Sequence, residues 1–167
     1  MKHGPIVMRR SRTLRAAAYA GAIVCAVAGL GMWATELGAW YAGLRQPTWK
    51  PPDAWFGPAW SLIYTLATVA AVRAWLYSQS AAQRRCLLSA FGLNAGLNLL
   101  WSVMFFRQRR PDWALAEVVL FWLSILALVL IARRIDAAAA WLLAPYVLWV
   151  GFAALLNLAV VRLNAPF

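Results

Sequence analysis

Residues 113–132 read WALAEVVLFWLSILALVLIA, and the only charged residue in this run is Glu117. A helix needs about 20 mainly apolar residues to cross the hydrocarbon core of a bilayer. The run therefore predicts one membrane-spanning helix, and its single carboxylate is an exception that needs a reason. An acid inside a membrane is costly, so Glu117 is a candidate ligand-binding residue. The alternative is that it pairs with a neighbouring arginine or benefits from the helix dipole.

Four other stretches are similarly long and apolar. The five predicted spans are residues 14–35, 55–77, 86–106, 113–132 and 139–161. Backbone groups without partners cannot face lipid, so every short connection falls at the end of a span. The first span follows a basic tail, residues 1–13, but is too long for a signal peptide, so we read it as a retained helix. The predicted fold is all-α, a single membrane domain (residues 14–167) of five transmembrane helices.

Composition and charge placement support a membrane protein. The 167 residues are 64% hydrophobic and 13% charged, with a formal net charge of +11. A soluble domain is nearer half apolar and a quarter charged. The basic residues form short clusters between apolar runs, which anchor helix ends at headgroups and argue against a nucleic-acid partner. The side that holds the N-terminal tail carries nine Lys and Arg against six, which favours a cytoplasmic N-terminus.

The inventory of reactive side chains excludes several kinds of site. The two cysteines and the one histidine stand apart in the sequence, so we expect no disulfide framework and no metal. No Ser–His–Asp set, phosphate-binding glycine loop or carboxylate pair is present. We therefore expect a binding protein more than an enzyme, with no required cofactor.

One connection is longer than a turn, and it reads ELGAWYAGLRQPTWKPPDA over residues 36–54. Its prolines fix backbone angles and make the loop stiffer than its length implies. A stiff aromatic loop at the mouth of a bundle can act as a lid. The alternative is a loop whose aromatic rings rest at headgroup depth.

Several of the eleven tryptophans lie inside spans rather than at their ends. An indole N–H in hydrocarbon needs a partner or a wet cavity. Trp60 shares a helix face with Tyr64, four residues on, and Asn98 lies on one stripe with Asn94 and Trp101. Singly, each Asn favours a link between helices; together with an indole they favour the wall of a polar and aromatic pocket.

Three ordered motifs resemble the signature of the TspO/MBR family, also called translocator proteins or tryptophan-rich sensory proteins. They are WYAGLRQPTWKPP (residues 40–52) followed by WFGPAWSLIY (55–64), LNLLWSVMFF (97–106) and PYVLWVGFAALLN (145–157). The resemblance covers nearly all of the chain after the basic tail. It implies a five-helix membrane bundle, often a homodimer, whose ligand cavity is closed by the first loop.

The resemblance also implies ligands and site residues. Family members bind porphyrins and haem-like tetrapyrroles, cholesterol in animals, and synthetic benzodiazepine-type drugs. Carried over by motif, the ligand-binding residues are Trp40, Tyr41, Trp60, Tyr64, Asn98, Trp101, Phe105, Trp149, Phe152, Ala153 and Leu156. The lid residues are Pro47, Trp49, Pro51 and Pro52.

Two departures from the family pattern narrow the expected ligand. Gln46 stands where the family usually has a lysine, so a charge contact to a ligand propionate there falls to Arg45 or Lys50. Leu158 stands at the tyrosine position of the cholesterol-recognition pattern, so cholesterol is a less favoured ligand than a tetrapyrrole.

Three functions stay open at this point. The first is a membrane sensor or carrier for porphyrin-type tetrapyrroles. The second is a light- and oxygen-dependent porphyrin-degrading enzyme, for which Trp60 and Trp149 would be the catalytic candidates. The third is a transporter of tetrapyrroles, sterols or other lipids. The alanine- and arginine-rich composition favours a bacterial cytoplasmic membrane, with an outer membrane as the alternative.

Overall fold

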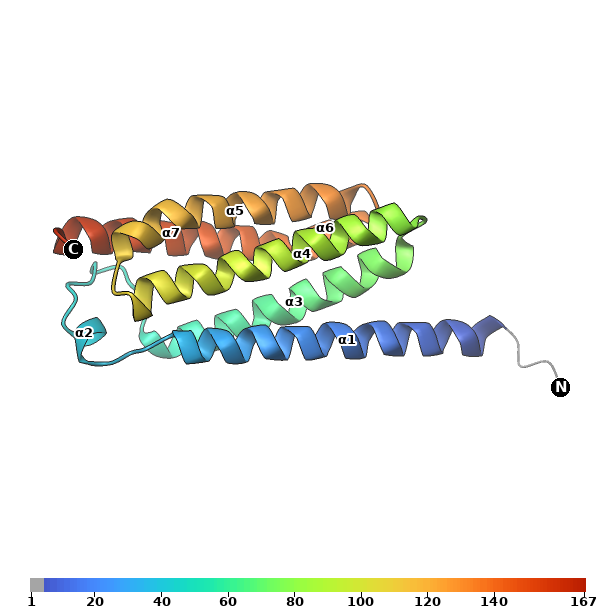
Figure 1. The fold of residues 1–167 in the computed structure, drawn as a ribbon, viewed down its shortest axis with the longest axis horizontal. Helices are drawn as coiled ribbons and strands as arrows, with labels where there is room; N and C mark the ends of the chain where they lie inside the picture. Colours follow the sequence, from blue (N-terminus) through green and yellow to red (C-terminus); the bar gives the residue numbers. More distant parts are fainter. Residues whose placement is uncertain (1–4) are drawn as a thin grey trace.

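In a computed structural model, the chain is an elongated helical bundle (Figure 1). The structure describes the backbone of residues 5–167 and the side chains of residues 18–19 and 21–167. Within the described residues every regular element is a helix, so the all-α prediction is confirmed there. The elements are α1 Pro5–Ala34, α2 Ala39–Ala42, η1 Asp53–Trp55, α3 Phe56–Tyr77, α4 Ala81–Ser102, η2 Val103–Arg107, α5 Pro111–Arg133, α6 Ala137–Leu142 and α7 Ala144–Asn164.

Four helical segments are long and apolar enough to cross a membrane: Asp53–Tyr77, Ala81–Arg107, Pro111–Arg133 and Ala137–Asn164. They correspond to the second to fifth predicted spans. Within the part of α1 whose side chains are described, residues Gly21–Ala34 form a shorter apolar helical segment. The predicted first span reaches back to residue 14, beyond the described side chains, so its full crossing stays a prediction. The helix itself begins earlier than expected, at Pro5, within the predicted tail.

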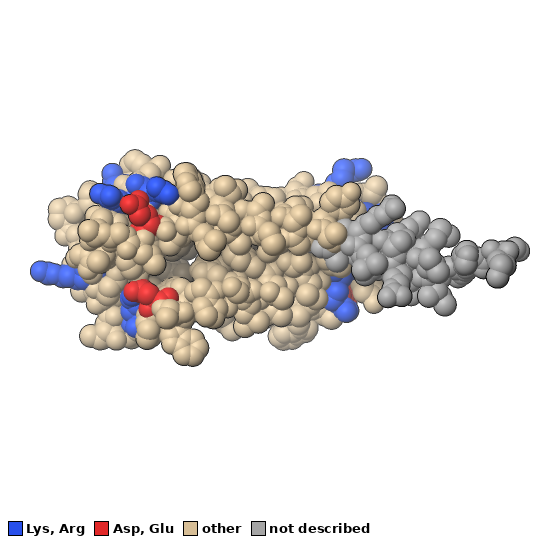
Figure 2. Space-filling model, turned by 90° about the horizontal axis from the view of Figure 1, so that it is seen from below, with Lys and Arg blue, Asp and Glu red and all other residues tan. Residues whose placement is uncertain are grey.

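The most enclosed of the long helices is α5, which packs against α4, α6 and α7. Helix α1 packs against α3 and α4. The buried face of α5 includes Val118, Phe121, Ile125 and Leu128. On the face that Figure 2 shows, Lys and Arg gather toward the two ends of the described part, and a long uncharged surface separates them. That distribution suits a bundle whose middle lies in lipid, because charges inside a bilayer are costly.

Local sequence signals set the helix boundaries. Ser80 and Gln83 form a capping box, so α4 begins at Ala81, before the predicted start at residue 86. Pro145 has no backbone N–H to continue the helix through the fifth span. The segment therefore breaks at Leu143 into α6 and α7. After α4, η2 is one turn of π-helix, in which the Gln108 N–H bonds to the Val103 carbonyl.

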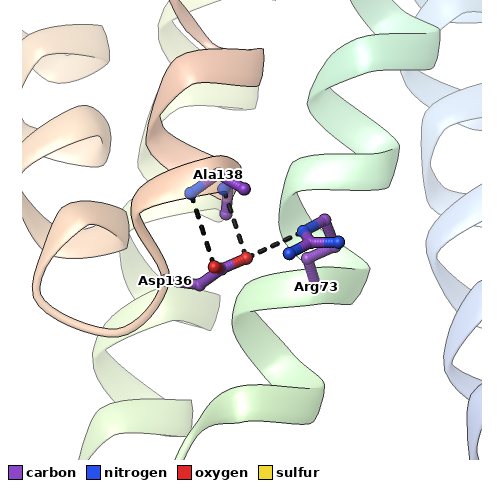
Figure 3. A network of polar contacts seen from close by, with 4 residues as sticks. Arg73, Asp136 and Ala138 are labelled. Atoms are coloured by element: carbon purple, nitrogen blue, oxygen red, sulfur yellow. Dashed lines mark hydrogen bonds and ion pairs between the residues drawn. The ribbon is translucent and has the colours of Figure 1, made fainter.

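Asp136 joins two helices at the end of the bundle opposite the α1–α3 loop (Figure 3). Its carboxylate accepts hydrogen bonds from the N–H groups of Ala138 and Ala139 and so caps α6. The same carboxylate pairs with Arg73 of α3 at 2.8 Å. The hydrogen bond from Arg73 holds the pKa of Asp136 below its usual value.

Candidate functional site

A cavity of about 450 Å³ lies inside the bundle at the end that carries the α1–α3 loop. Helices α1, α3, α4 and α7, with η2, contribute its walls, and the loop covers it. Nine of the twelve predicted ligand-binding residues line it. They are Tyr41, Trp60, Tyr64, Asn98, Trp101, Phe105, Trp149, Ala153 and Leu156. This volume falls in the range of roughly 300–1,000 Å³ that small-molecule sites occupy.

Aromatic rings from three helices meet on the cavity wall. The Trp60 ring of α3 lies 5.3 Å from the Tyr64 ring and 6.4 Å from the Trp149 ring of α7. On the opposite stretch of wall, Trp101 lies 5.3 Å from Phe105. The π-helical turn places Phe105 here, because it shifts the register of α4 at its last turn. The site therefore offers large flat apolar surfaces at fixed angles.

Few polar groups interrupt this wall. The Tyr64 hydroxyl donates to Asn98 Oδ1 at 3.1 Å, and the Trp101 indole donates to Asn157 Oδ1 at 3.1 Å. Asn157 also donates to the Pro111 carbonyl at 2.8 Å, so it joins α4, α5 and α7. These bonds give Asn157 a structural role, although this residue also lines the cavity. Trp149 differs from Trp101, because its buried indole nitrogen has no partner among the described residues.

The two asparagines on the α4 stripe lie in different surroundings. Asn94 is buried in the core, where it accepts from the Tyr146 hydroxyl at 3.0 Å and donates to Ser124 at 2.8 Å. Asn98, one turn further on, reaches the cavity. Asn94 therefore fits the prediction of a link between helices. The position of Asn98 fits the prediction of a pocket wall.

The α1–α3 loop lies across the mouth of the cavity. Tyr41 donates to Asp53 Oδ1 at 3.0 Å, and Lys50 pairs with the same oxygen at 2.6 Å. Burial, together with the bond to Asp53, raises the pKa of the Tyr41 phenol. The backbone of Arg45 forms two hydrogen bonds with the Asn164 side chain at the end of α7, at 2.8 and 2.9 Å. Tyr41, Gln46 and Asp53 border the cavity itself.

Three predicted ligand-binding residues lie off the cavity wall. Trp40 packs against Phe105, with ring centroids 6.2 Å apart. Phe152 faces the outer side of α7 and contacts both Trp49 and Trp149. Glu117 is buried in α5, with 6% of its surface exposed and neither oxygen hydrogen-bonded within the described chain. No ion pair links it to an arginine in that part of the chain, so the expected pairing with a neighbouring arginine is not found there.

The predicted lid residues also lie outside the wall. Pro47 and Trp49 border a separate groove on the outer surface, whereas Pro51 and Pro52 lead into η1. Sequence reasoning missed other wall residues, which include Gly31, Gln46, Asp53, Phe56, Ser102, Phe106 and Val160. Gly31 and Val160 carry no chemical signal and line the cavity through helix packing. Among the described residues, no group of three or more His, Cys, Asp or Glu side chains could hold a metal.

Comparisons with known proteins find a family match over most of the chain. The model of the TspO/MBR family matches residues 18–163. Protein CrtK of Rhodobacter capsulatus is 33% identical over 142 residues, covering 85% of this chain and 89% of that protein. The tryptophan-rich sensory protein of Cereibacter sphaeroides is 34% identical over 125 residues, covering 75% and 77%. The translocator protein of Homo sapiens is 31% identical over 126 residues, covering 75% of each chain.

Proposed function

The chain belongs to the TspO/MBR family of integral membrane proteins, and on that premise we propose that it binds a porphyrin-type tetrapyrrole in the cavity beneath the α1–α3 loop. In this proposal the protein is a membrane sensor or carrier. The observation that carries it is the aromatic wall formed by Trp60, Tyr64, Trp101 and Trp149 around one cavity.

The shape and chemistry of the wall support a flat apolar ligand. Aromatic rings prefer offset or edge-to-face arrangements, and each such pair contributes about 0.5–1.5 kcal/mol beyond its buried area. A tetrapyrrole presents a broad aromatic face and thus uses several of these rings at once. Trp60 and Trp149 meet almost perpendicularly, at 87°, so a macrocycle that stacks on one indole meets the edge of the other.

The polar groups lie where they would orient the ligand's carboxylates. Tyr41, Gln46 and Asp53 border the loop end of the cavity. The negative charge of Asp53 is offset by Lys50 at 2.6 Å, so the pair repels a ligand carboxylate less than a lone aspartate would. We therefore expect the propionates to point towards the loop and the macrocycle to lie between α3 and α7.

A porphyrin-degrading activity is the second candidate, and the Trp60–Trp149 contact on the cavity wall favours it. Both indoles lie where a bound macrocycle would touch them. The binding function ranks higher because an indole is not a general acid or base, and no His is among the described residues that line the wall. Transport driven by an ion gradient ranks lowest, because the described spans hold few charges to couple to ions.

The test is a titration of the purified protein with protoporphyrin in detergent, first in the dark and then under illumination. The proposal expects saturable quenching of tryptophan fluorescence in the dark, with the porphyrin absorption band intact afterwards. Loss of that band in light, abolished in Trp149→Phe, would establish the degrading enzyme instead. Absence of saturable quenching in the dark would overturn tetrapyrrole binding.

A further inference from the structure

A second hollow lies on the outer surface, where the α1–α3 loop meets the C-terminal half of α7. It is an open groove of about 770 Å³, and it differs from the cavity in facing outward. The lining residues are Gln46, Pro47, Thr48, Trp49, Phe152, Leu155, Leu158, Ala159, Arg162 and Leu163. Most of them are apolar, and Leu155 is 61% exposed. In a bundle set in a bilayer, such a surface faces lipid.

The groove and the cavity share one residue, Gln46. Its amide nitrogen is buried and has no hydrogen-bond partner in the described part of the chain. A buried donor without a partner costs about 1–3 kcal/mol. The amide nitrogen of Gln46 is thus not held in place by a hydrogen bond to a described residue. At this point the wall between lipid and cavity therefore depends on one weakly held side chain.

The rest of the wall is the helix α7 itself. Neighbouring residues along it face opposite spaces: Phe152 and Leu155 border the groove, while Ala153 and Leu156 border the cavity. Phe152 also bridges the two spaces, since its ring lies 5.8 Å from Trp49 outside and 5.7 Å from Trp149 inside. These are ring contacts without hydrogen bonds, and side-chain rotation alone can part them.

Polar bonds hold both the mouth under the loop and the junction of the loop with α7. Asp53 binds both Tyr41 and Lys50, at 3.0 and 2.6 Å. The two bonds between Arg45 and Asn164 fix the loop backbone next to Gln46, so movement there falls to side chains. Opening the mouth would break the contacts of Asp53, whereas opening the seam at Gln46 needs only side chains to move while the Arg45–Asn164 bonds stay closed.

We propose that the groove is the membrane-side vestibule of the cavity, and that the ligand passes laterally between lipid and cavity past Gln46. The ligand class is an apolar molecule dissolved in the bilayer that carries a carboxylate or another hydrogen-bond acceptor. Its apolar body stays out of water along this route. The acceptor meets the free amide of Gln46, and exposed Arg162, which forms no ion pair with a described acid, attracts a carboxylate at the rim. This inference rests on the proposed function, since it needs a ligand in the cavity.

The test is stopped-flow measurement of protoporphyrin binding and release in Ala159→Trp, which fills the groove from α7 without reaching the cavity wall. We expect association and dissociation both to slow roughly tenfold, within the range over which association rates vary among variants of one site. The dissociation constant should stay unchanged, because the obstacle lies on the route and not in the site. Leu148→Trp is the matched control: it adds the same indole to the same helix, at a position 74% exposed and bordering neither hollow.

A second variant repeats the test from another position in the groove. Leu155→Trp enlarges a residue that borders the groove and not the cavity, so both rate constants should again fall while the dissociation constant stays unchanged. Equal rates in Ala159→Trp and Leu148→Trp, with saturable binding in both, would overturn the lateral route and leave the proposed function intact. Absence of binding to the unaltered protein would reject the proposed function itself.

Discussion

The Tyr64 hydroxyl donates to Asn98 Oδ1 across 3.1 Å, and this bond joins α3 to α4 on the wall of the aromatic cavity. Asn98 borders the cavity, where its amide can meet a ligand acceptor. One helical turn away, the Asn94 side chain is buried in the core, where it bonds to Tyr146 and Ser124. The two asparagines thus form a natural pair for separating ligand binding from stability.

Asn98→Leu should weaken tetrapyrrole affinity about three- to tenfold, which corresponds to one lost hydrogen bond of roughly 0.5–1.5 kcal/mol. Asn94→Leu should leave affinity unchanged but lower the free energy of unfolding by about 1–3 kcal/mol, because it strands the Tyr146 hydroxyl in the core. Fluorescence titration and thermal unfolding in detergent measure the two effects. Equal losses of affinity in both variants would remove Asn98 from the binding site.

Trp149→Phe and Trp122→Phe should differ in stability. The Trp149 indole nitrogen is buried without a partner, so its removal should leave the melting temperature unchanged or raise it. The Trp122 indole donates to the Val147 carbonyl at 3.0 Å, so its removal should lower the free energy of unfolding by about 1 kcal/mol. Thermal unfolding of the two variants side by side checks this. A larger loss in Trp149→Phe would mean that its indole nitrogen has a partner.

Asp136→Ala should lower the free energy of unfolding by about 1 kcal/mol, the usual cost of removing an N-cap. Asp136→Asn should cost less, because the amide oxygen can still accept from the N–H groups that begin α6. The measurement is thermal unfolding at neutral pH. Equal losses in the two variants would show that the cap contributes little and the ion pair to Arg73 dominates.

The same carboxylate predicts an acid dependence of stability. The hydrogen bond from Arg73 holds the pKa of Asp136 below its usual 3.8, so the folded state binds fewer protons than the unfolded state. The contribution is therefore complete above about pH 3.8 and is lost as the pH falls through the folded-state pKa. Asp136→Asn should flatten this part of the acid-unfolding curve. An unchanged curve would exclude Asp136 as a source of acid sensitivity.

The sequence predicts the helices well because hydropathy and length are local properties. It predicts their ends less well, although two signals were readable: the Ser80–Gln83 capping box before α4 and Pro145 within the fifth span. The π-helical turn at Val103–Arg107 has no comparable local signal, since it is part of how α4 meets its neighbours. Helix existence was therefore predictable, but the irregular turn that places Phe105 was not.

The ligand site, like the helices, could be predicted only in part. The family motifs predict most of the aromatic wall, but they do not separate residues that face the cavity from those one step around the helix. Phe152 and Ala153 are adjacent in one motif, and only the second borders the cavity. Asn94 and Asn98 lie on one stripe, and only tertiary packing gives them different neighbours. Glu117 stood out in the sequence because it is the only charge in its span. The structure buries it on α5, and it is not among the residues that line the cavity.

The measurement that tests the central claim most directly is the protoporphyrin dissociation constant of Ala153→Trp against that of Leu148→Trp. Ala153 lines the cavity, and an indole there would occupy much of its 450 Å³. Leu148 is 74% exposed on the same helix and borders neither hollow. We predict that Ala153→Trp loses saturable binding while it remains folded, and that Leu148→Trp binds as the unaltered protein does. Undiminished affinity in a folded Ala153→Trp variant would contradict the account, because the ligand would then bind elsewhere.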